Sequence, residues 1–123
     1  MIGDIYFKTA GHKARFIEAM KGHTYDGGHL DSEYGSALYI LTSDYHLWED
    51  ATTYVGPHSI LIEDMIEHVD LSGGFRVLVE LAGNLFNGNV QVNIVDLQKL
   101  DEANLKVAFM ALNLRFYRWS MSS

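Results

Sequence analysis

Two histidines and two aspartates lie within nine residues of one another in the first third of the chain. They are His23, Asp26, His29 and Asp31, in and just after a glycine-rich polar segment that runs from Gly22 to Leu30. Imidazole nitrogens and carboxylate oxygens are ligands for zinc, manganese or iron, and glycine lets the backbone turn around an ion. The spacing matches no established metal motif, and a polar surface loop explains the same residues. A metal-dependent enzyme built on this loop is one hypothesis, and a turn that holds no ion is the other.

Aromatic residues make up 12% of the chain, more than a small core requires. Tyrosine and tryptophan combine an apolar ring with a polar atom, which suits protein interfaces and pockets that stack a planar ligand. We predict that contacts with a ligand or partner come from Tyr25, Tyr34, Tyr39, Trp48 and Trp119. In this hypothesis the segment from Tyr25 to Tyr39 forms an aromatic pocket for a small ligand or a nucleotide.

Other residue patterns give no catalytic constellation. The serines lie where helix caps or turns are expected, and the sequence has no Gly-x-Ser-x-Gly elbow. Asp64 and His68 have a spacing that can chelate an ion on a helix, although a solvated acidic helix face explains them better. The amides of Gly73-Gly74 could receive an anion, but neither a phosphate-loop lysine nor a dinucleotide fingerprint accompanies them. We predict no catalytic residues and no cofactor.

Composition excludes several classes of protein. Sixteen acidic residues against nine basic ones give a net charge of −7, which opposes attraction to nucleic acids and anionic membranes. The absence of cysteine rules out disulfides and thiolate zinc sites. The chain has no apolar run of the roughly 18 to 20 residues that span a membrane, and Met1 to Lys8 does not read as a signal peptide. We therefore expect a soluble cytoplasmic protein that binds neither nucleic acid nor membrane.

Six stretches repeat apolar residues at helical spacing, and each one begins at or just after a side chain that can cap a helix N-terminus. They run from Ala10 to Lys21 behind Thr9, from Asp31 or Ser32 to near Thr42, from Ser43 to Ala51, from Ser59 to Val69, from Ser72 to Asn87, and from Asp101 to Trp119. The segments Thr52 to Val55 and Val90 to Val95 are more β-prone, while Ile94 to Leu100 equally fits a helical turn. The sequence predicts a mainly α, compact single domain over residues 1–123, a bundle of five or six helices. One short β element is allowed, at Tyr54 or over Val90 to Val92.

The last two helices are expected to form the centre of the bundle. An apolar stripe extends from Phe75 to Phe86 over about three helical turns. In the final helix Leu105, Phe109, Leu112 and Phe116 recur at positions i, i+4, i+7 and i+11, and Ala108 allows a close approach. We predict that these four side chains are buried against the preceding helix.

Four blocks of sequence carry a resemblance: Ile5-Tyr6-Phe7 with His12 and Arg15-Phe16, Ala37 to Leu41, Leu81 to Gly88, and Leu100 to Asn104 with Arg115-Phe116. Together they resemble an uncharacterised protein family of Gram-positive bacteria and their phages or mobile elements. They are spread over most of the chain and consist mainly of core and cap residues. The resemblance implies a compact helical domain with no assigned activity, and it supplies no catalytic residues.

The leading functional hypothesis is a binding or accessory protein without catalytic activity, which acts through protein contacts as a bacterial or phage regulator or inhibitor would. Surplus aromatic residues and an acidic surface that can compete for a basic site on a partner favour it. The alternatives are a small-ligand or nucleotide-binding protein and the metal-dependent enzyme. Because Tyr117 and Trp119 follow the last core turn beside Arg118, we also expect a homodimer.

Overall fold

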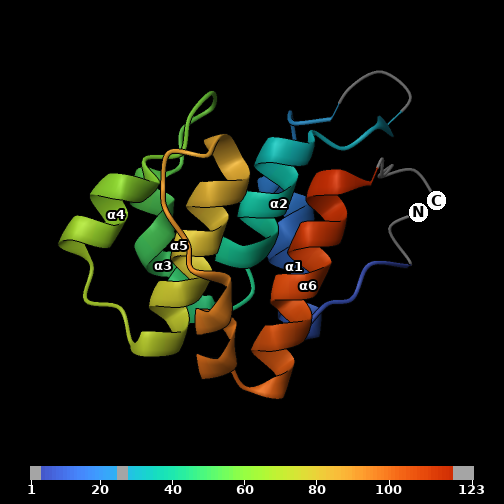
Figure 1. Ribbon diagram of the computed structural model, residues 1–123. Coiled ribbons are helices and arrows are strands. Elements are labelled where there is room, and N and C mark those ends of the chain that lie inside the picture. The colour runs from blue at the N-terminus through green and yellow to red at the C-terminus, as the bar shows by residue number, and fades with distance from the viewer. Residues whose placement is uncertain (1–3, 25–27, 118–123) are drawn as a thin grey trace.

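Helices make up most of the computed structural model, in which residues 4–24 and 28–117 are described. The α-helices are α1 (Ala10–Ala19), α2 (Ser32–Leu41), α3 (Tyr45–Ala51), α4 (Ile62–His68), α5 (Gly73–Asn87) and α6 (Glu102–Phe116) (Figure 1). Short 3-10 helices follow α3 at Thr52–Tyr54 and precede α6 at Ile94–Lys99. The prediction of a mainly α bundle is confirmed.

Side-chain caps begin several of these helices at the predicted residues. Thr9 accepts a hydrogen bond from the His12 amide at 3.0 Å, and Asp101 accepts one from the Asn104 amide at 2.8 Å. Asp31 caps α2 in the same way. The prediction that Ser43 caps the third helix is wrong. Its hydroxyl donates backwards to the carbonyl of Ile40 at 2.6 Å, and the carboxylate of Asp44 caps α3.

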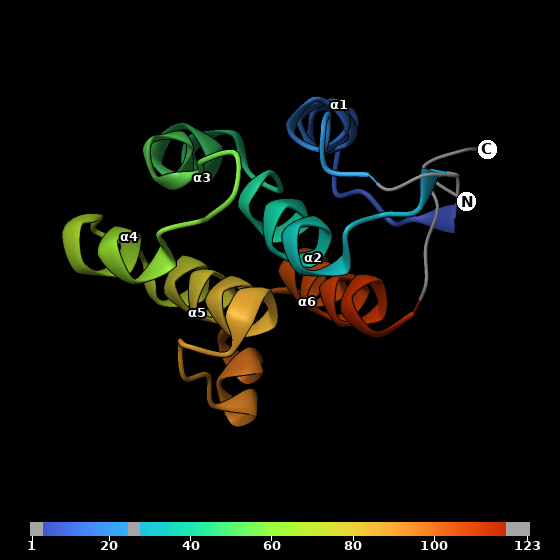
Figure 2. The same cartoon turned by 90° about the horizontal axis from the view of Figure 1, so that it is seen from above.

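Helix α2 lies at the centre of the bundle. Seen from above, α1 and α3 lie on one side of it and α5 and α6 on the other (Figure 2). All residues of α2 from Tyr34 to Leu41 are buried. The expectation that α5 and α6 form the central pair is therefore wrong, because each packs more extensively on α2 than on the other. Small side chains in α2, such as Ser36 and Ala37, allow helices to approach it from several directions.

Helix α6 turns a different face to the core from the one predicted. Its buried residues are Val107, Ala108, Ala111 and Leu114. Phe109 and Phe116 are instead 56% and 71% exposed, and Leu105 and Leu112 are only half-buried. The prediction is wrong because α6 carries apolar residues all round, so that periodicity alone does not select a face. The alanines give α6 its closest approach to α2, and the phenylalanines consequently point outwards.

The β-prone segments form no strands among residues 4–24 and 28–117. Thr52–Tyr54 is a 3-10 helix, Val55 makes a single antiparallel bridge to Ile60, and a second isolated bridge joins Thr24 to Leu30. At the end of α5, Gly88 adopts the left-handed conformation (φ 77°), which turns the chain back along α5. None of the described helices is long and apolar enough to cross a membrane.

Candidate functional site

Two of the four predicted metal-binding residues, His23 and Asp31, make other contacts in the structure. The His23 ring stacks on Tyr34 with centroids 4.2 Å apart, and the Asp31 carboxylate accepts the amides of Glu33 and Tyr34 at 3.1 Å each. His29 has a buried Nδ1 without a hydrogen-bond partner in the described chain, and Asp26 lies outside the described residues. Within residues 4–24 and 28–117, no three His, Asp or Glu side chains gather in a way that could hold an ion. Because Asp26 lies outside these ranges, the metal site formed with it stays a prediction.

Two of the five predicted aromatic contact residues, Tyr34 and Tyr39, lie in the core. Tyr34 is 7% exposed and donates its hydroxyl to the Gly56 carbonyl at 3.1 Å, and Tyr39 is fully buried with its hydroxyl donating to the Tyr6 carbonyl. Burial raises the pKa of both hydroxyls, and Asp31 adds to the rise at Tyr34. Trp48 is half-buried against the core, while Tyr25 and Trp119 lie outside the described residues. Neither buried tyrosine ring is available to stack a ligand.

His12 is a buried polar residue that the sequence did not single out as a functional candidate. It is fully buried, its Nδ1 accepts the Lys8 amide at 3.0 Å, and its Nε2 lies 2.8 Å from the Tyr39 carbonyl. The imidazole is therefore neutral, with its proton on Nε2. Burial lowers the pKa of His12 to about 4. The hydrogen bond to Tyr39 acts in the opposite direction, and Arg15 and Lys8 contribute to the lowering.

Charge is strongly segregated along the chain. Between Lys21 and Arg76 the sequence contains ten acidic residues and no lysine or arginine, whereas the rest of the chain has six acidic residues and nine basic ones. Helices α3 and α4 and their connections carry most of this charge at the surface. We define the acidic face as the exposed residues Glu49, Asp50, Glu63, Asp64, Glu67 and Asp70.

Basic side chains elsewhere are largely occupied. Arg15 and Arg115 donate through Nε to the carbonyls of Thr42 and Leu85, each at 2.8 Å, close to a helix C-terminus. The Lys8 ammonium donates to Asn104, and Arg76 pairs with Glu80. No described residue of the acidic face forms an ion pair with lysine or arginine. Within residues 4–24 and 28–117, the acidic face therefore carries negative charge that no lysine or arginine neutralises.

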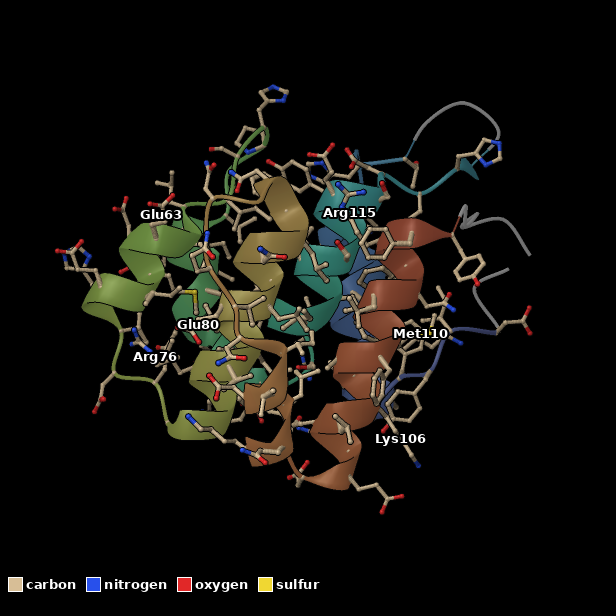
Figure 3. All side chains as sticks on the ribbon, in the orientation of Figure 1. Glu63, Arg76, Glu80, Lys106, Met110 and Arg115 are labelled. Carbon is tan, nitrogen blue, oxygen red and sulfur yellow. The ribbon has the colours of Figure 1, made fainter. Side chains whose placement is uncertain are left out.

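A groove of about 330 Å³ opens beside the acidic face, between the start of α4 and the turn after α5. Glu63 and Asp64 are in the first turn of α4, and Glu63 lies on the outer side of that helix (Figure 3). The groove is lined by Ser59, Ile60, Leu61, Ile62, Glu63, Asp64, Phe86, Asn87, Asn89 and Val90. It combines two carboxylates and two amides with an apolar floor.

The core holds this groove in place. The ring of Phe86 packs edge-on against Tyr34, with centroids 5.2 Å apart at 85°, and the Asn84 amide donates to the Val90 carbonyl at 2.9 Å. Asp64 and His68, which were expected on a solvated acidic helix face, are both exposed, and His68 Nδ1 lies 2.9 Å from the Asp64 backbone carbonyl. The Asp64 carboxylate therefore remains one of the groove's acidic groups. Periodicity indicated only the part of the acidic face that lies on the helix predicted from Ser59 to Val69, and the groove, which joins segments far apart in sequence, had no sequence signal.

A second surface lies on the outer side of α6. We define the α6 face as Tyr6, Lys106, Phe109, Met110, Asn113, Phe116 and Tyr117. The first five line an open groove of about 440 Å³, and Phe116 and Tyr117 extend it as rings that are 71% and 69% exposed. Lys106 and Met110 project from the side of α6 opposite to α5 (Figure 3). This surface is apolar and aromatic, unlike the acidic face.

No protein-family model, curated protein or solved structure matches the chain. The resemblance to a family of Gram-positive bacteria and their mobile elements stays a prediction.

Proposed function

We propose that this protein is an acidic binding protein that acts through protein contacts and takes a basic segment of a partner on the acidic face. A bacterial or phage regulator or inhibitor would act in this way by occupying a basic site on its target. The observation that carries the proposal is the groove between α4 and α5, where an apolar floor lies beside Glu63 and Asp64.

Lysine and arginine have the two parts that such a groove accepts. Their methylene stems pack on apolar surface while the charged head stays near water or a carboxylate. Here the stem would lie over Phe86 and Leu61, and the head would reach Glu63 or Asp64. A volume of about 330 Å³ is at the small end of the roughly 300 to 1,000 Å³ of ligand pockets, which suits one side chain.

The surrounding charge would attract the partner before contact. Each exposed ion pair contributes only about 0.2 to 1 kcal/mol, so the two carboxylates of the groove cannot supply the affinity alone. The whole acidic face raises the association rate for a cationic partner, and salt weakens this effect. Phosphate-bearing ligands such as nucleotides are disfavoured at the same groove because its charged side chains are acidic.

The test is binding of a hexa-arginine peptide, measured by calorimetry and by amide chemical shifts. We expect shifts at residues 59–64 and 86–90, and a roughly tenfold or greater loss of affinity in the Glu63→Gln, Asp64→Asn variant. A tenfold loss corresponds to about 1.4 kcal/mol, which is within the range for two exposed charges.

The matched control is Glu18→Gln, Glu102→Gln, which changes the net charge equally on α1 and α6. Both glutamates are exposed; Glu18 pairs with Lys21 just beyond the end of α1, and Glu102 pairs with Lys106 on α6. We expect this variant to bind within about twofold of the unmodified chain at moderate salt. Equal losses of affinity in both variants would show that peptide binding depends only on the net charge of the protein. The proposal that the peptide binds in the groove would then be wrong.

A further inference from the structure

Helix α6 exposes large apolar side chains along one side. Phe109 and Phe116 are 56% and 71% exposed, and Tyr117 beyond the end of the helix is 69% exposed. Large aromatic rings that share one face of a helix favour an interaction surface, whereas scattered exposed apolar residues need no explanation. We propose that a second copy of this chain covers the α6 face, with the two α6 helices packed antiparallel.

The spacing on this face fits a two-helix seam. Lys106, Phe109, Asn113 and Phe116 follow one another at intervals of three, four and three residues, the alternation by which one helix packs against another in a coiled coil. In an antiparallel pair centred near the middle of α6, Lys106 of one copy lies opposite Phe116 of the other. An ammonium over an aromatic ring is a favourable contact. Lys106 already lies in this way over the Tyr6 ring of its own chain, 5.9 Å from the centroid.

Charge along α6 favours the antiparallel direction. Asp101 and Glu102 lie at its N-terminal end and Arg115 lies in its last turn. Arg115 donates to the Leu85 carbonyl on the α5 side of the helix and so lies away from the contact. An antiparallel arrangement places Asp101 and Glu102 of each copy beside the C-terminal end of the other helix and opposes the two helix dipoles, whereas a parallel arrangement would bring the acidic N-terminal ends together.

The acidic face lies away from the α6 face, so that two negatively charged monomers can associate through the α6 face. In both ribbon views α4 lies at one end of the molecule and α6 toward the other, so that the acidic face would point away from a partner on α6 (Figures 1 and 2). The repulsion expected from a net charge of −7 is therefore reduced at this surface. A basic partner protein, by contrast, would be drawn toward the acidic face.

The available area indicates a dimer of moderate affinity. Aromatic side chains bury roughly 150 to 250 Å² each, so the exposed parts of Phe109, Phe116 and Tyr117 supply roughly 400 Å², about half of the 800 Å² per partner of a standard interface. Tyr6, Lys106 and Met110 contribute to the remainder. We expect dimers at protein concentrations of about 100 μM.

Sedimentation and light scattering test the association. At about 100 μM the unmodified chain should have twice its mass of 13.9 kDa, and the Phe109→Glu, Phe116→Glu variant should be monomeric. The matched control is Ile94→Glu, Val95→Glu, whose side chains are 57% and 60% exposed in the 3-10 helix before α6. It makes the same change of charge and should remain dimeric, and thermal melts verify that both variants fold. A monomeric unmodified chain, or a dimer that the Phe109 and Phe116 changes leave intact, would overturn the proposal.

Cysteine cross-linking tests the direction, because the chain has no cysteine of its own. Met110→Cys lies near the middle of α6 and should give a disulfide-linked dimer under oxidation, while Glu102→Cys at the end of the helix should not. Cross-linking of both variants would indicate parallel helices, and cross-linking of neither would contradict the α6 contact.

Discussion

His12 shows how a single polar residue can be tolerated in a core. Both ring nitrogens are hydrogen-bonded to backbone groups, at Lys8 and at Tyr39, so that burial costs little as long as the ring is neutral. Protonation would place a charge among Phe7, Phe16 and Tyr39 and would turn the Nδ1 acceptor into a donor that faces the Lys8 amide. His12 therefore links the stability of the α1–α2 contact to pH.

We predict that acidification destabilises the protein through His12. Its pKa is about 4 in the folded chain against an ordinary value of 6.5. Between these values the unfolded chain binds more protons, so stability is fully present above about pH 6.5 and falls as the pH is lowered toward 4. The contribution lost between pH 7 and pH 5 is about 2 kcal/mol, measured by urea denaturation at each pH.

His12→Gln is the control, since an amide can still donate to the Tyr39 carbonyl but does not titrate. The free energy of unfolding of this variant should fall by about 2 kcal/mol less over the same pH interval, whatever its stability at pH 7. Identical pH slopes for the two proteins would show that His12 is not the titrating group.

Residues with local roles were the ones that the sequence could predict. Thr9, Asp31 and Asp101 cap helices because each carboxylate or hydroxyl reaches an amide two or three residues ahead, and this requires no tertiary information. Ser43 fits the same pattern but lies one residue too early, where its hydroxyl closes α2 instead. The role of His12 could not be predicted, because its partner Tyr39 is 27 residues away.

At the scale of the elements, α6 illustrates where periodicity fails. Apolar residues occupy every side of this helix, so that two different faces satisfy a helical repeat. Packing decided between them, since Ala108 and Ala111 permit the close approach to α2 that Phe109 would prevent. Phe109 and Phe116, which the sequence assigned to the core, are instead exposed on the α6 face. Their exposure is what makes this face a candidate interaction surface.

The junction of α4, α5 and the turn after α5 depends on Gly83. A Cβ at this position would lie 2.6 Å from Val90 Cγ2 and 2.8 Å from Ile62 Cγ2, and both neighbours are branched close to the backbone. We predict that Gly83→Ala lowers the free energy of unfolding by about 1 to 3 kcal/mol in spite of alanine's higher helix propensity. Because Ile62 and Val90 also line the groove, hexa-arginine binding should weaken in the folded variant.

Gly73→Ala provides the contrast within the same helix. Nothing lies within 4 Å of a Cβ at the start of α5, so that this change should stabilise the protein by about 0.4 to 1 kcal/mol. Denaturation midpoints distinguish the two glycines. A neutral or stabilising Gly83→Ala would mean that α4 and the Val90 turn can move apart without cost, and that the groove is not rigidly formed.

At the scale of the whole molecule, charge and apolar surface are separated. The sequence predicted an acidic protein with surplus aromatic residues, but two of its five predicted contact residues, Tyr34 and Tyr39, are buried by the fold. The absence of lysine and arginine between Lys21 and Arg76 is visible in the sequence, but the sequence could not show that residues 59–64 meet residues 86–90. That meeting depends on how the helices pack on α2, which no local pattern encodes.

This separation predicts that the two surfaces act independently. Mutations that are distant and share no contacts have additive effects, so the monomeric Phe109→Glu, Phe116→Glu variant should bind hexa-arginine within about twofold of the unmodified chain. The Glu63→Gln, Asp64→Asn variant should still form dimers.

Salt should affect peptide binding and dimerisation differently. Between about 50 and 500 mM NaCl, peptide affinity should fall roughly tenfold or more, because the Debye length shortens and exposed charges are screened. Dimer affinity should stay constant or rise, because apolar burial is insensitive to screening and the repulsion between two acidic monomers decreases. Calorimetry and sedimentation on the same samples measure both quantities, and a parallel loss of both with salt would show that a single electrostatic surface carries binding and self-association.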